Sequence, residues 1–281
     1  MTMIRNTYGK SRVRVMRVHR DGPHHGVREL SVQAMLEGDF GPSYTEADNR
    51  LSIATDTVKN LTYVVAREAL DAEAEIFGQK LAMRFLDLYP QVERATVTMH
   101  ETKWRRASFA GQPHDHNFVL DANGKPFAEV AMTRDGTTIR SGIEGYTFMK
   151  STQSGWADFH RDAYTTLPDT SDRLCATAMD AHWSWSAAPE SYDDANARIL
   201  ATMLQVFGTT YSHSVQDSLY RMGEAALAEV PELATISMAC PNKHYLPVNL
   251  APFGMTADNA VFIPTDEPHG QIECVVGRGQ P

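Results

Sequence analysis

The order of strand-like and helix-like segments restricts the fold of this chain more than any other feature. Residues 10–18 and 30–36 alternate apolar and polar side chains with a period of two, which predicts a pair of half-buried strands in a hairpin. Residues 56–70 and 71–90 instead carry apolar side chains at helical spacing, and Asp71 is expected to cap the second helix. Two strands followed by two helices therefore open the chain.

The same order returns further along the chain. After the first two helices, the alternating residues 94–106 and 117–122 and the turn signals out to Lys150 predict antiparallel strands. The second round comprises a strand over 176–185, helices over 193–207 and 215–228, and a strand that ends at 241–246. We interpret this order as a two-fold internal repeat, with one domain over residues 1–150 and another over 151–281. Free sheet edges can pair with further chains, so an oligomer is expected.

Composition excludes several classes of function. The chain is 42% hydrophobic and 22% charged, as in globular proteins, and no window approaches the roughly 18 apolar residues of a membrane span. Residues 1–20 lack the apolar segment of a secretion signal. A net charge of −9 disfavours general binding to nucleic acid or to an anionic membrane. Three scattered cysteines without a CxxC motif indicate a reducing compartment, so a cytoplasmic protein is expected.

A polar strand end, PNKHYL at residues 241–246, follows an apolar run. Successive side chains of a strand face opposite ways, so Asn242 and His244 share one face while Lys243 and Tyr245 share the other. A solvated strand end explains this pattern by itself. A pair of polar groups that point together also suits a binding site.

Lys10 and Thr55 are candidates for proton transfer. Asp56 or Thr57 is expected to cap a helix, because side-chain oxygens accept hydrogen bonds from free N–H groups there. Thr55, one residue earlier, is less well explained by capping, and the positive potential of a helix start would help its hydroxyl to relay a proton. Lys10 at the start of the first strand is a solvated charge by default, but a partly desolvated lysine can act as a base.

Arg173, Gln216 and Trp156 are candidates for binding a flat ligand. The planar fork of Arg173 suits an edge with two acceptors, and Gln216 offers one donor and one acceptor. Trp156 could stack on a planar ring. Each residue also has an ordinary structural explanation: a surface ion pair or a helix cap for Arg173 and Gln216, and a core position for Trp156. They indicate a binding site only if all three contact the same ligand.

The HDH motif places His114 and His116 on one face of a strand, as in some metal sites. No matching third ligand stands nearby, so a strand-face role is favoured over a metal site. The chain also lacks the GxGxxG, GxxxxGK[ST], GxSxG and HExxH motifs. Nucleotide-cofactor and hydrolase functions therefore have no support.

Six motifs, taken together and in order, resemble the urate oxidase (uricase) family along essentially the whole chain. They are YGK at 8–10, ATDTVKN at 54–60, FMKSTQSGWADFHRDAYTTLPDTSDR at 148–173, YSHSVQDSLYRMG at 211–223, PNKHYL at 241–246 and VFIPTDEPHGQIE at 261–273. The resemblance implies an α+β chain of two tandem tunnelling-fold domains, each an antiparallel sheet with helices on one face. It also implies a barrel-like homotetramer with sites between subunits.

The resemblance also implies roles for individual residues. Lys10, Thr55 and His244 would abstract and relay a proton. Arg173 and Gln216 would hold the pyrimidine side of urate, assisted by the backbone around Val215 and Asp56, and Asn242 would face the dioxygen or water position. Trp156 stands where the family commonly stacks a phenylalanine, which changes the volume of the expected pocket.

The implied reaction is the oxidation of urate by dioxygen and water to 5-hydroxyisourate and hydrogen peroxide, with neither metal nor organic cofactor. Two alternatives stay open. A tunnelling-fold protein that binds a purine or a pterin could keep the pocket without this chemistry. A metalloenzyme could be built on His114 and His116.

Overall fold

A computed structural model describes residues 2–256 and 258–279 of the chain. By its internal contacts the protein forms two compact units. The first unit extends to Gly142 and includes Glu190–Asp193, and the second contains the rest of the chain from Ile143 onward. The passage between them lies inside one strand, β7 (Thr137–Lys150), eight residues before the division at residue 150 that the sequence suggests.

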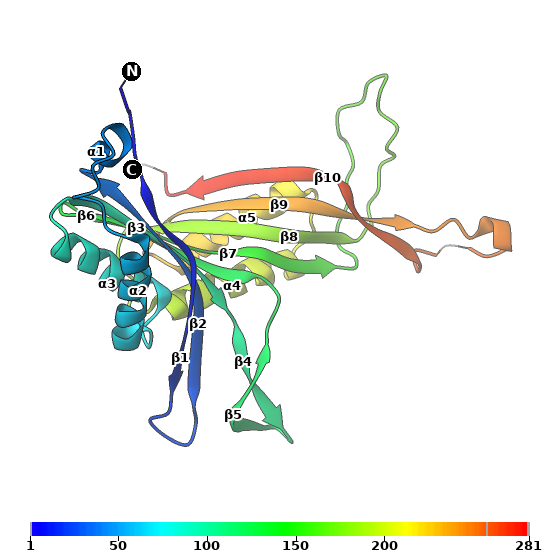
Figure 1. The fold of residues 1–281 in the computed structure, drawn as a ribbon. Helices are drawn as coiled ribbons and strands as arrows, with labels where there is room; N and C mark the ends of the chain where they lie inside the picture. Colours follow the sequence, from blue (N-terminus) through cyan, green and yellow to red (C-terminus); the bar gives the residue numbers. More distant parts are fainter. Residues whose placement is uncertain (1, 257, 280–281) are drawn as a thin grey trace. The chain divides into compact units, whose positions relative to one another are not determined.

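The first unit is an antiparallel sheet with two helices on one face (Figure 1). Its strands run in the order β1-β2-β3-β6, and the start of β7 belongs to the same unit. The strands are β1 (Tyr8–His19), β2 (Gly26–Gly38), β3 (Val92–Thr102) and β6 (Lys125–Thr133), and β4 (Trp104–Phe109) pairs with β5 (Gln112–Leu120) in a separate ribbon. The helices are α1 (Gly41–Thr45), α2 (Thr55–Ala69) and α3 (Ala74–Leu88).

Alternation and helical spacing together produce the core of this unit. On β2 the alternating residues Leu30, Val32, Ala34 and Leu36 are buried, and they face the helices. From α3, Phe77, Leu81 and Phe85 pack into the same cluster and are fully buried. Burying side chains of this size stabilises the fold by about 1.5–3 kcal/mol each.

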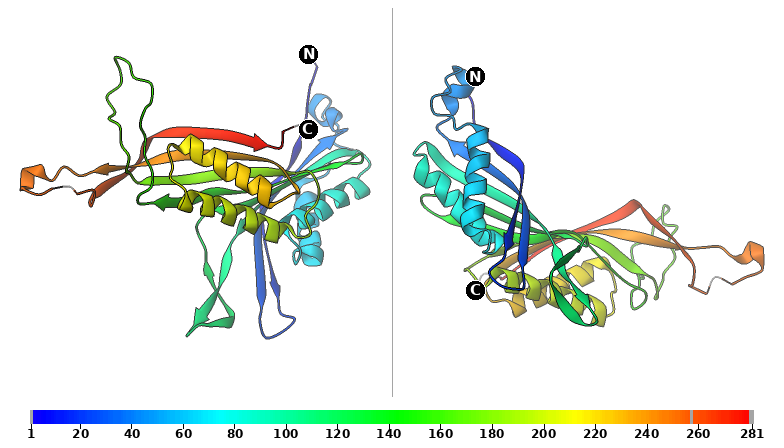
Figure 2. Two further views of the ribbon diagram at one scale, coloured as in Figure 1. Left: turned by 180° about the vertical axis from the view of Figure 1, so that it is seen from behind. Right: turned by 60° about the horizontal axis from the view of Figure 1, so that its bottom comes forward.

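The second unit repeats the arrangement. Its strands run in the order β7-β8-β9-β10, with β8 (Cys175–Trp185), β9 (Leu233–Pro247) and β10 (Phe262–Gly277), and a short η1 helix (Ala251–Phe253) follows β9. Helices α4 (Tyr192–Thr209) and α5 (Val215–Glu229) cover one face of this sheet, as both views in Figure 2 show. Ile199 and Met203 of α4 and Leu219 of α5 fill its core.

The observed order of elements confirms the predicted α+β class and the repeat. In each half, two strands of the main sheet precede two long helices, and two further strands of that sheet follow them. The first half also contains the short helix α1 and the β4–β5 ribbon. Two local expectations are wrong. Residues 94–106 are divided into β3 and β4 at Lys103, and α3 begins at Ala74 with Glu73 at its N-cap, so Asp71 does not cap it. Among the described residues, no helix is long and apolar enough to cross a membrane.

Candidate active site

Lys10 lies at the start of β1, where the strand approaches its neighbour unusually closely. A Cβ atom on Gly9 would lie 1.9 Å from the carbonyl oxygen of Ala34 on β2, so only glycine fits this position. The register of β1 shifts between Lys10 and Val13. Tyr8 also ties this end of β1 to the segment before α2, because its hydroxyl accepts a 2.7 Å hydrogen bond from the Ile53 N–H. The YGK motif therefore fixes the backbone that carries Lys10.

Thr55 and Asp56 form the first turn of α2 and are exposed. Ala54 occupies the N-cap, and no side chain caps this end. The expectation that Asp56 or Thr57 caps the helix is therefore wrong, because the helix begins before both. Thr55 lies at the N-terminus, where the free N–H groups give a positive potential.

Asp56 joins the charges at this end of α2. Its carboxylate accepts hydrogen bonds from Lys59 at 2.5 Å and from Asn60 at 2.9 Å. The bond from Lys59 is the main cause that holds the pKa of Asp56 below its ordinary value, and the positive charge of Lys10 contributes to the same lowering. Lys10, Thr55 and Asp56 thus gather in one place in the first unit.

In the second unit, Asn242 and His244 lie on β9. Cys240, Asn242 and His244 alternate along one face of the strand, and Cys240 packs into the core beneath the helices. Lys243 points the other way and forms an ion pair with Asp266 of β10 at 2.9 Å. The predicted shared face of Asn242 and His244 is therefore the face that carries α4 and α5.

The loop over residues 151–174 carries Trp156 and Arg173 and is closed at its base by backbone hydrogen bonds. Trp156 and Thr170 exchange bonds of 2.7 and 2.9 Å, and the Arg173 N–H donates to the Ser154 carbonyl at 2.9 Å. The base is also joined to the segment before α5, because the Gly155 N–H donates to the carbonyl of Ser212 at 2.9 Å. Trp156 and Arg173 are consequently held beside the start of α5.

Val215 and Gln216 are the first two residues of α5. Ser214 caps this helix by accepting a 3.0 Å hydrogen bond from the Asp217 N–H. Gln216 is exposed and Val215 is partly buried. Backbone N–H groups at a helix start suit an acceptor on a ligand, so this end can bind a polar ring edge.

The guanidinium of Arg173 retains unused hydrogen-bonding capacity. Its buried Nε has no hydrogen-bond partner, and no ion pair of Arg173 is found within the described residues. Trp156 stacks on Phe159 with ring centres 5.4 Å apart and an angle of 9° between the planes, and Arg161 lies 4.5 Å over the other ring. Phe159 therefore supports one face of the Trp156 indole ring.

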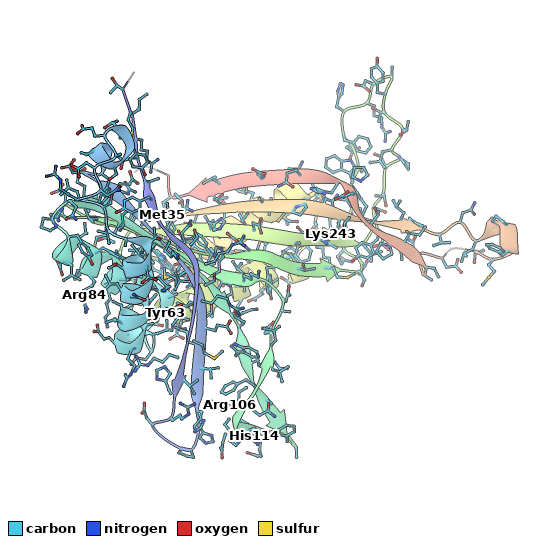
Figure 3. The ribbon with its side chains drawn as sticks, in the orientation of Figure 1. Met35, Tyr63, Arg84, Arg106, His114 and Lys243 are labelled. Atoms are coloured by element: carbon cyan, nitrogen blue, oxygen red, sulfur yellow. The ribbon has the colours of Figure 1, made fainter. Side chains whose placement is uncertain are left out.

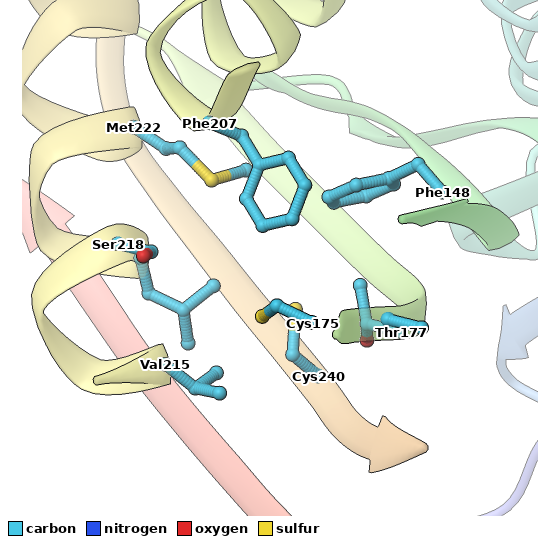
Figure 4. A pocket seen from close by; sticks show the side chains of 10 residues that line it. Phe148, Cys175, Thr177, Phe207, Val215, Ser218, Met222 and Cys240 are labelled. Atoms are coloured by element: carbon cyan, nitrogen blue, oxygen red, sulfur yellow. The ribbon is translucent and has the colours of Figure 1, made fainter. Parts of the chain in front are cut away.

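A small apolar cavity lies beneath the start of α5 (Figure 4). Phe148, Phe207 and Met222 line it together with Val215, and the thiols of Cys175 and Cys240 complete the wall. Its volume is about 10 Å³, which is close to the minimum for one water molecule. Burial raises the pKa of the Cys240 thiol to about 12, so this thiol stays protonated at neutral pH.

His114 and His116 lie on β5 in the first unit and do not join the other candidates. Their ring centres are 4.7 Å apart, and both rings line an open pocket with Trp104 and Phe118. Arg106 and His114 lie on this hairpin of β4 and β5 (Figure 3). Arg106 supports the hairpin by donating to the carbonyls of His114 and Asp115 at 2.7 Å each. In the part of the chain that is described, no three His, Cys, Asp or Glu side chains are grouped in a way that could hold a metal ion.

The candidates form two groups, one in each unit. Lys10, Thr55 and Asp56 belong to the first unit. Trp156, Arg173, Val215, Gln216, Asn242 and His244 belong to the second. Sequence reasoning missed the residues that support both groups, namely Tyr8, Ser212 and Tyr211, because a partly buried tyrosine or a buried serine beside a motif carries no periodic signal of its own.

Comparison with known proteins matches this arrangement to one family. The family described as Uricase matches residues 6–131 and 139–273. The chain is 36% identical over 288 residues to the uricase of Emericella nidulans, covering 96% of this chain and 95% of that one. It is also 36% identical over 273 residues to the uricase of Arthrobacter globiformis, covering 97% and 89%.

The crystal structure of uricase from Arthrobacter globiformis has the same fold, with a TM-score of 0.94 and 35% identity over 99% of this chain and 95% of that chain. The fold therefore defines an α+β protein of the class to which solved uricases belong. With this coverage and identity, the chain belongs to the uricase family.

Proposed function

We propose that this chain is a urate oxidase, which oxidises urate with dioxygen and water to 5-hydroxyisourate and hydrogen peroxide without a metal or an organic cofactor. The family match over nearly the whole chain is the observation that carries this proposal. The side-chain chemistry of the two groups supports it, because one group suits proton removal and the other suits a flat, polar ring.

Proton removal belongs to the first group. The hydroxyl of Thr55 lies at the positive end of α2, where a negative charge on its oxygen is stabilised. Lys10 accepts the proton that Thr55 relays, and His244 continues the relay. The Asp56 carboxylate accepts hydrogen bonds from Lys59 and Asn60, and the Asp56 backbone contacts the ligand.

Substrate binding belongs to the second group. Arg173 turns its planar fork to two acceptors on the pyrimidine side of urate, and its unpartnered Nε is available for one of them. Gln216 and the N–H of Val215 bind the neighbouring edge. Trp156 stacks on the ring plane, and Asn242 faces the position of dioxygen and later of water.

The chemistry follows from the electronic state of dioxygen. Triplet dioxygen does not combine readily with a closed-shell molecule, so the substrate must first give up one electron. Removing a further proton makes urate electron-rich enough to do so, and Arg173 offsets the added negative charge. Overall, urate loses two electrons and two protons to dioxygen, which becomes hydrogen peroxide, and water adds at C5.

Two further parts of the proposal concern assembly and compartment. We assign the complete site to the seam between subunits of a homotetramer, so that the first group of one chain meets the second group of its neighbour. The acidic composition and the scattered cysteines support a cytoplasmic location.

The test is to mix purified protein, stripped of metal by chelation, with urate in air-saturated buffer. Urate absorbance and hydrogen peroxide are followed together. The proposal predicts that one molecule of peroxide appears for each urate consumed. Urate that binds but persists would instead identify a purine-binding protein, and activity that returns only with metal would identify a metalloenzyme.

A further inference from the structure

The base of the 151–174 loop contains an unusually close approach between a glycine and a tyrosine. A Cβ atom on Gly155 would lie 2.2 Å from the hydroxyl oxygen of Tyr211 and 2.8 Å from the carbonyl oxygen of Thr170. No side chain can occupy that space without displacing one of these groups. Gly155 is buried and Tyr211 is partly exposed, so an added methyl group would push the Tyr211 hydroxyl away from the loop base.

The tyrosine hydroxyl occupies this space because it makes a hydrogen bond to the other side of the loop base. Tyr211 donates to the carbonyl of Ser171 at 2.8 Å, only two residues before Arg173. The segment that carries Tyr211 leads directly into α5, and its next residue, Ser212, exchanges backbone hydrogen bonds with Gln153 and Gly155 at 2.9 Å each. One short segment therefore contacts both strands of the loop base.

The same segment is anchored to α5 from within. Ser218 of α5 donates to the hydroxyl of Ser212 at 2.6 Å, and both serines are buried. Displacing Tyr211 would thus change the position of Arg173 and Trp156 relative to the first turn of α5. The three ligand-binding elements share one small framework, in which the side chains of Tyr211 and Thr152 bond directly to the strand leading to Arg173, at Ser171 and Asp172 respectively.

We propose that Tyr211 is a positioning residue for substrate binding, and that Gly155 is required because it leaves room for the Tyr211 hydroxyl. This inference rests on the proposed function, since the ligand whose binding it sets is urate. Tyr211 does not touch the reacting atoms. It holds Arg173 and Trp156 in register with Val215 and Gln216.

The experiment combines Tyr211→Phe, Gly155→Ala and the double variant. Losing one hydrogen bond in the framework should raise KM for urate by about three- to tenfold in Tyr211→Phe, with kcat within about twofold of wild type. Gly155→Ala should raise KM by more than tenfold, because overpacking displaces the loop. Removing the hydroxyl oxygen relieves the closest clash, so the double variant should bind urate better than Gly155→Ala alone.

Tyr220→Phe is the matched control, because Tyr220 lies on α5, is 55% exposed and has a hydroxyl that pairs with Glu224 of the same helix. It should leave KM unchanged. A purely structural role for Tyr211 would lower the melting temperature and the active fraction, and hence kcat, without changing KM. That pattern would overturn the inference, as would additive effects of the two substitutions.

Urate binding without oxygen, measured by calorimetry, separates this inference from the proposed function. A wild-type protein that binds urate but does not oxidise it contradicts the proposed function alone. In that case the dissociation constants of the same variants still decide the role of Tyr211, with the same expected three- to tenfold change. Equal dissociation constants for wild type and Tyr211→Phe would refute the positioning role.

Discussion

The start of α2 and the base of the 151–174 loop are built in different ways. At the start of α2, Lys10, Asp56 and Lys59 interact through charged side chains that project from regular elements, and Asp56 is exposed. At the loop base, backbone hydrogen bonds and buried serines make the connections, with Ser212 and Ser154 at 1% and 0% exposure. The first region is joined through charged side chains, whereas the second is joined mainly through backbone hydrogen bonds and neutral hydroxyl groups.

This difference predicts a division of labour. Substitutions in the first region should change proton transfer while the fold and the bound ligand stay in place. Substitutions in the second region should change where the ligand lies and how tightly it binds. The variants below test the division, from the largest expected effect to the smallest.

Lys10→Met and Thr55→Ala should each lower kcat by about two to four orders of magnitude, the usual contribution of a positioned general base. Urate binding without oxygen should stay within a few fold of wild type, because neither side chain grips the ring. Steady-state kinetics and calorimetry measure the two quantities. Lys80→Met, at an exposed position of α3, is the control. Unchanged turnover in both variants would remove the assigned base.

Arg173→Lys should raise KM for urate by about 10- to 100-fold, because lysine lacks the planar fork and a hydrogen bond to a charged group contributes about 1.5–3 kcal/mol. Its kcat should fall less. Arg198→Lys on α4, whose arginine pairs with Glu229 at 3.0 Å, serves as the comparison and should leave KM unaltered. If kcat fell and KM did not, the division between the two regions would be wrong.

The loss of folding stability at acidic pH should depend on Glu29 in the first unit. Hydrogen bonds from Arg14 and from Trp104, the latter at 2.9 Å, hold the pKa of Glu29 below its ordinary value of 4.5. A lowered pKa means that the charged carboxylate stabilises the folded state above the unfolded pKa, and that this stability is lost as pH falls through the folded pKa.

Glu29→Gln should therefore cost about 1–3 kcal/mol of unfolding free energy at pH 7, and the difference from wild type should narrow as the pH falls below 4.5. Melting temperatures between pH 3 and 7 measure it. Glu29 belongs to neither group of site residues, so KM for urate at pH 7 should not change. A gap that widens toward low pH would contradict the sign of the shift.

Trp156→Phe should have the smallest effect. A phenyl ring keeps the stacking on Phe159 and on the ligand but presents a smaller face, so KM should change by about two- to fivefold. Comparing urate with bulkier purines measures the accompanying change in tolerance. Trp156→Ala is the comparison variant and should raise KM for urate more than Trp156→Phe does. Equal KM values for the two variants would show that the ring does not stack on the substrate.

The sequence predicts the regular elements well because periodicity reflects burial. Val13 and Val15 alternate on β1, and the spacing of Phe77, Leu81 and Phe85 is that of the buried face of α3. Helix starts are harder. Ala54 and Glu73 occupy the N-caps without a side-chain hydrogen bond, so no capping residue marks either position.

The framework of the site was beyond sequence reasoning for a physical reason. The hydrogen bonds of Ser212 with Gln153 and Gly155 join residues that are far apart in the chain, and backbone pairing of this kind leaves no pattern in side chains. Side-chain chemistry made Trp156, Arg173 and Gln216 candidates for binding a flat ligand, and only the resemblance to a family predicted that they act on the same one. Their shared support on Tyr211 becomes visible only when the loop is folded.

The central claim is that the two groups complete one site between different chains. The most direct test is to dissociate Lys10→Met and Arg173→Gln, each of which impairs one group, then mix them, reassemble them and assay turnover at urate concentrations well below the KM of Arg173→Gln. Seams that join an intact first group to an intact second group should then appear, and random mixing predicts recovery of about one quarter of wild-type urate turnover. A mixture no more active than the sum of the two variants would contradict a site built across subunits.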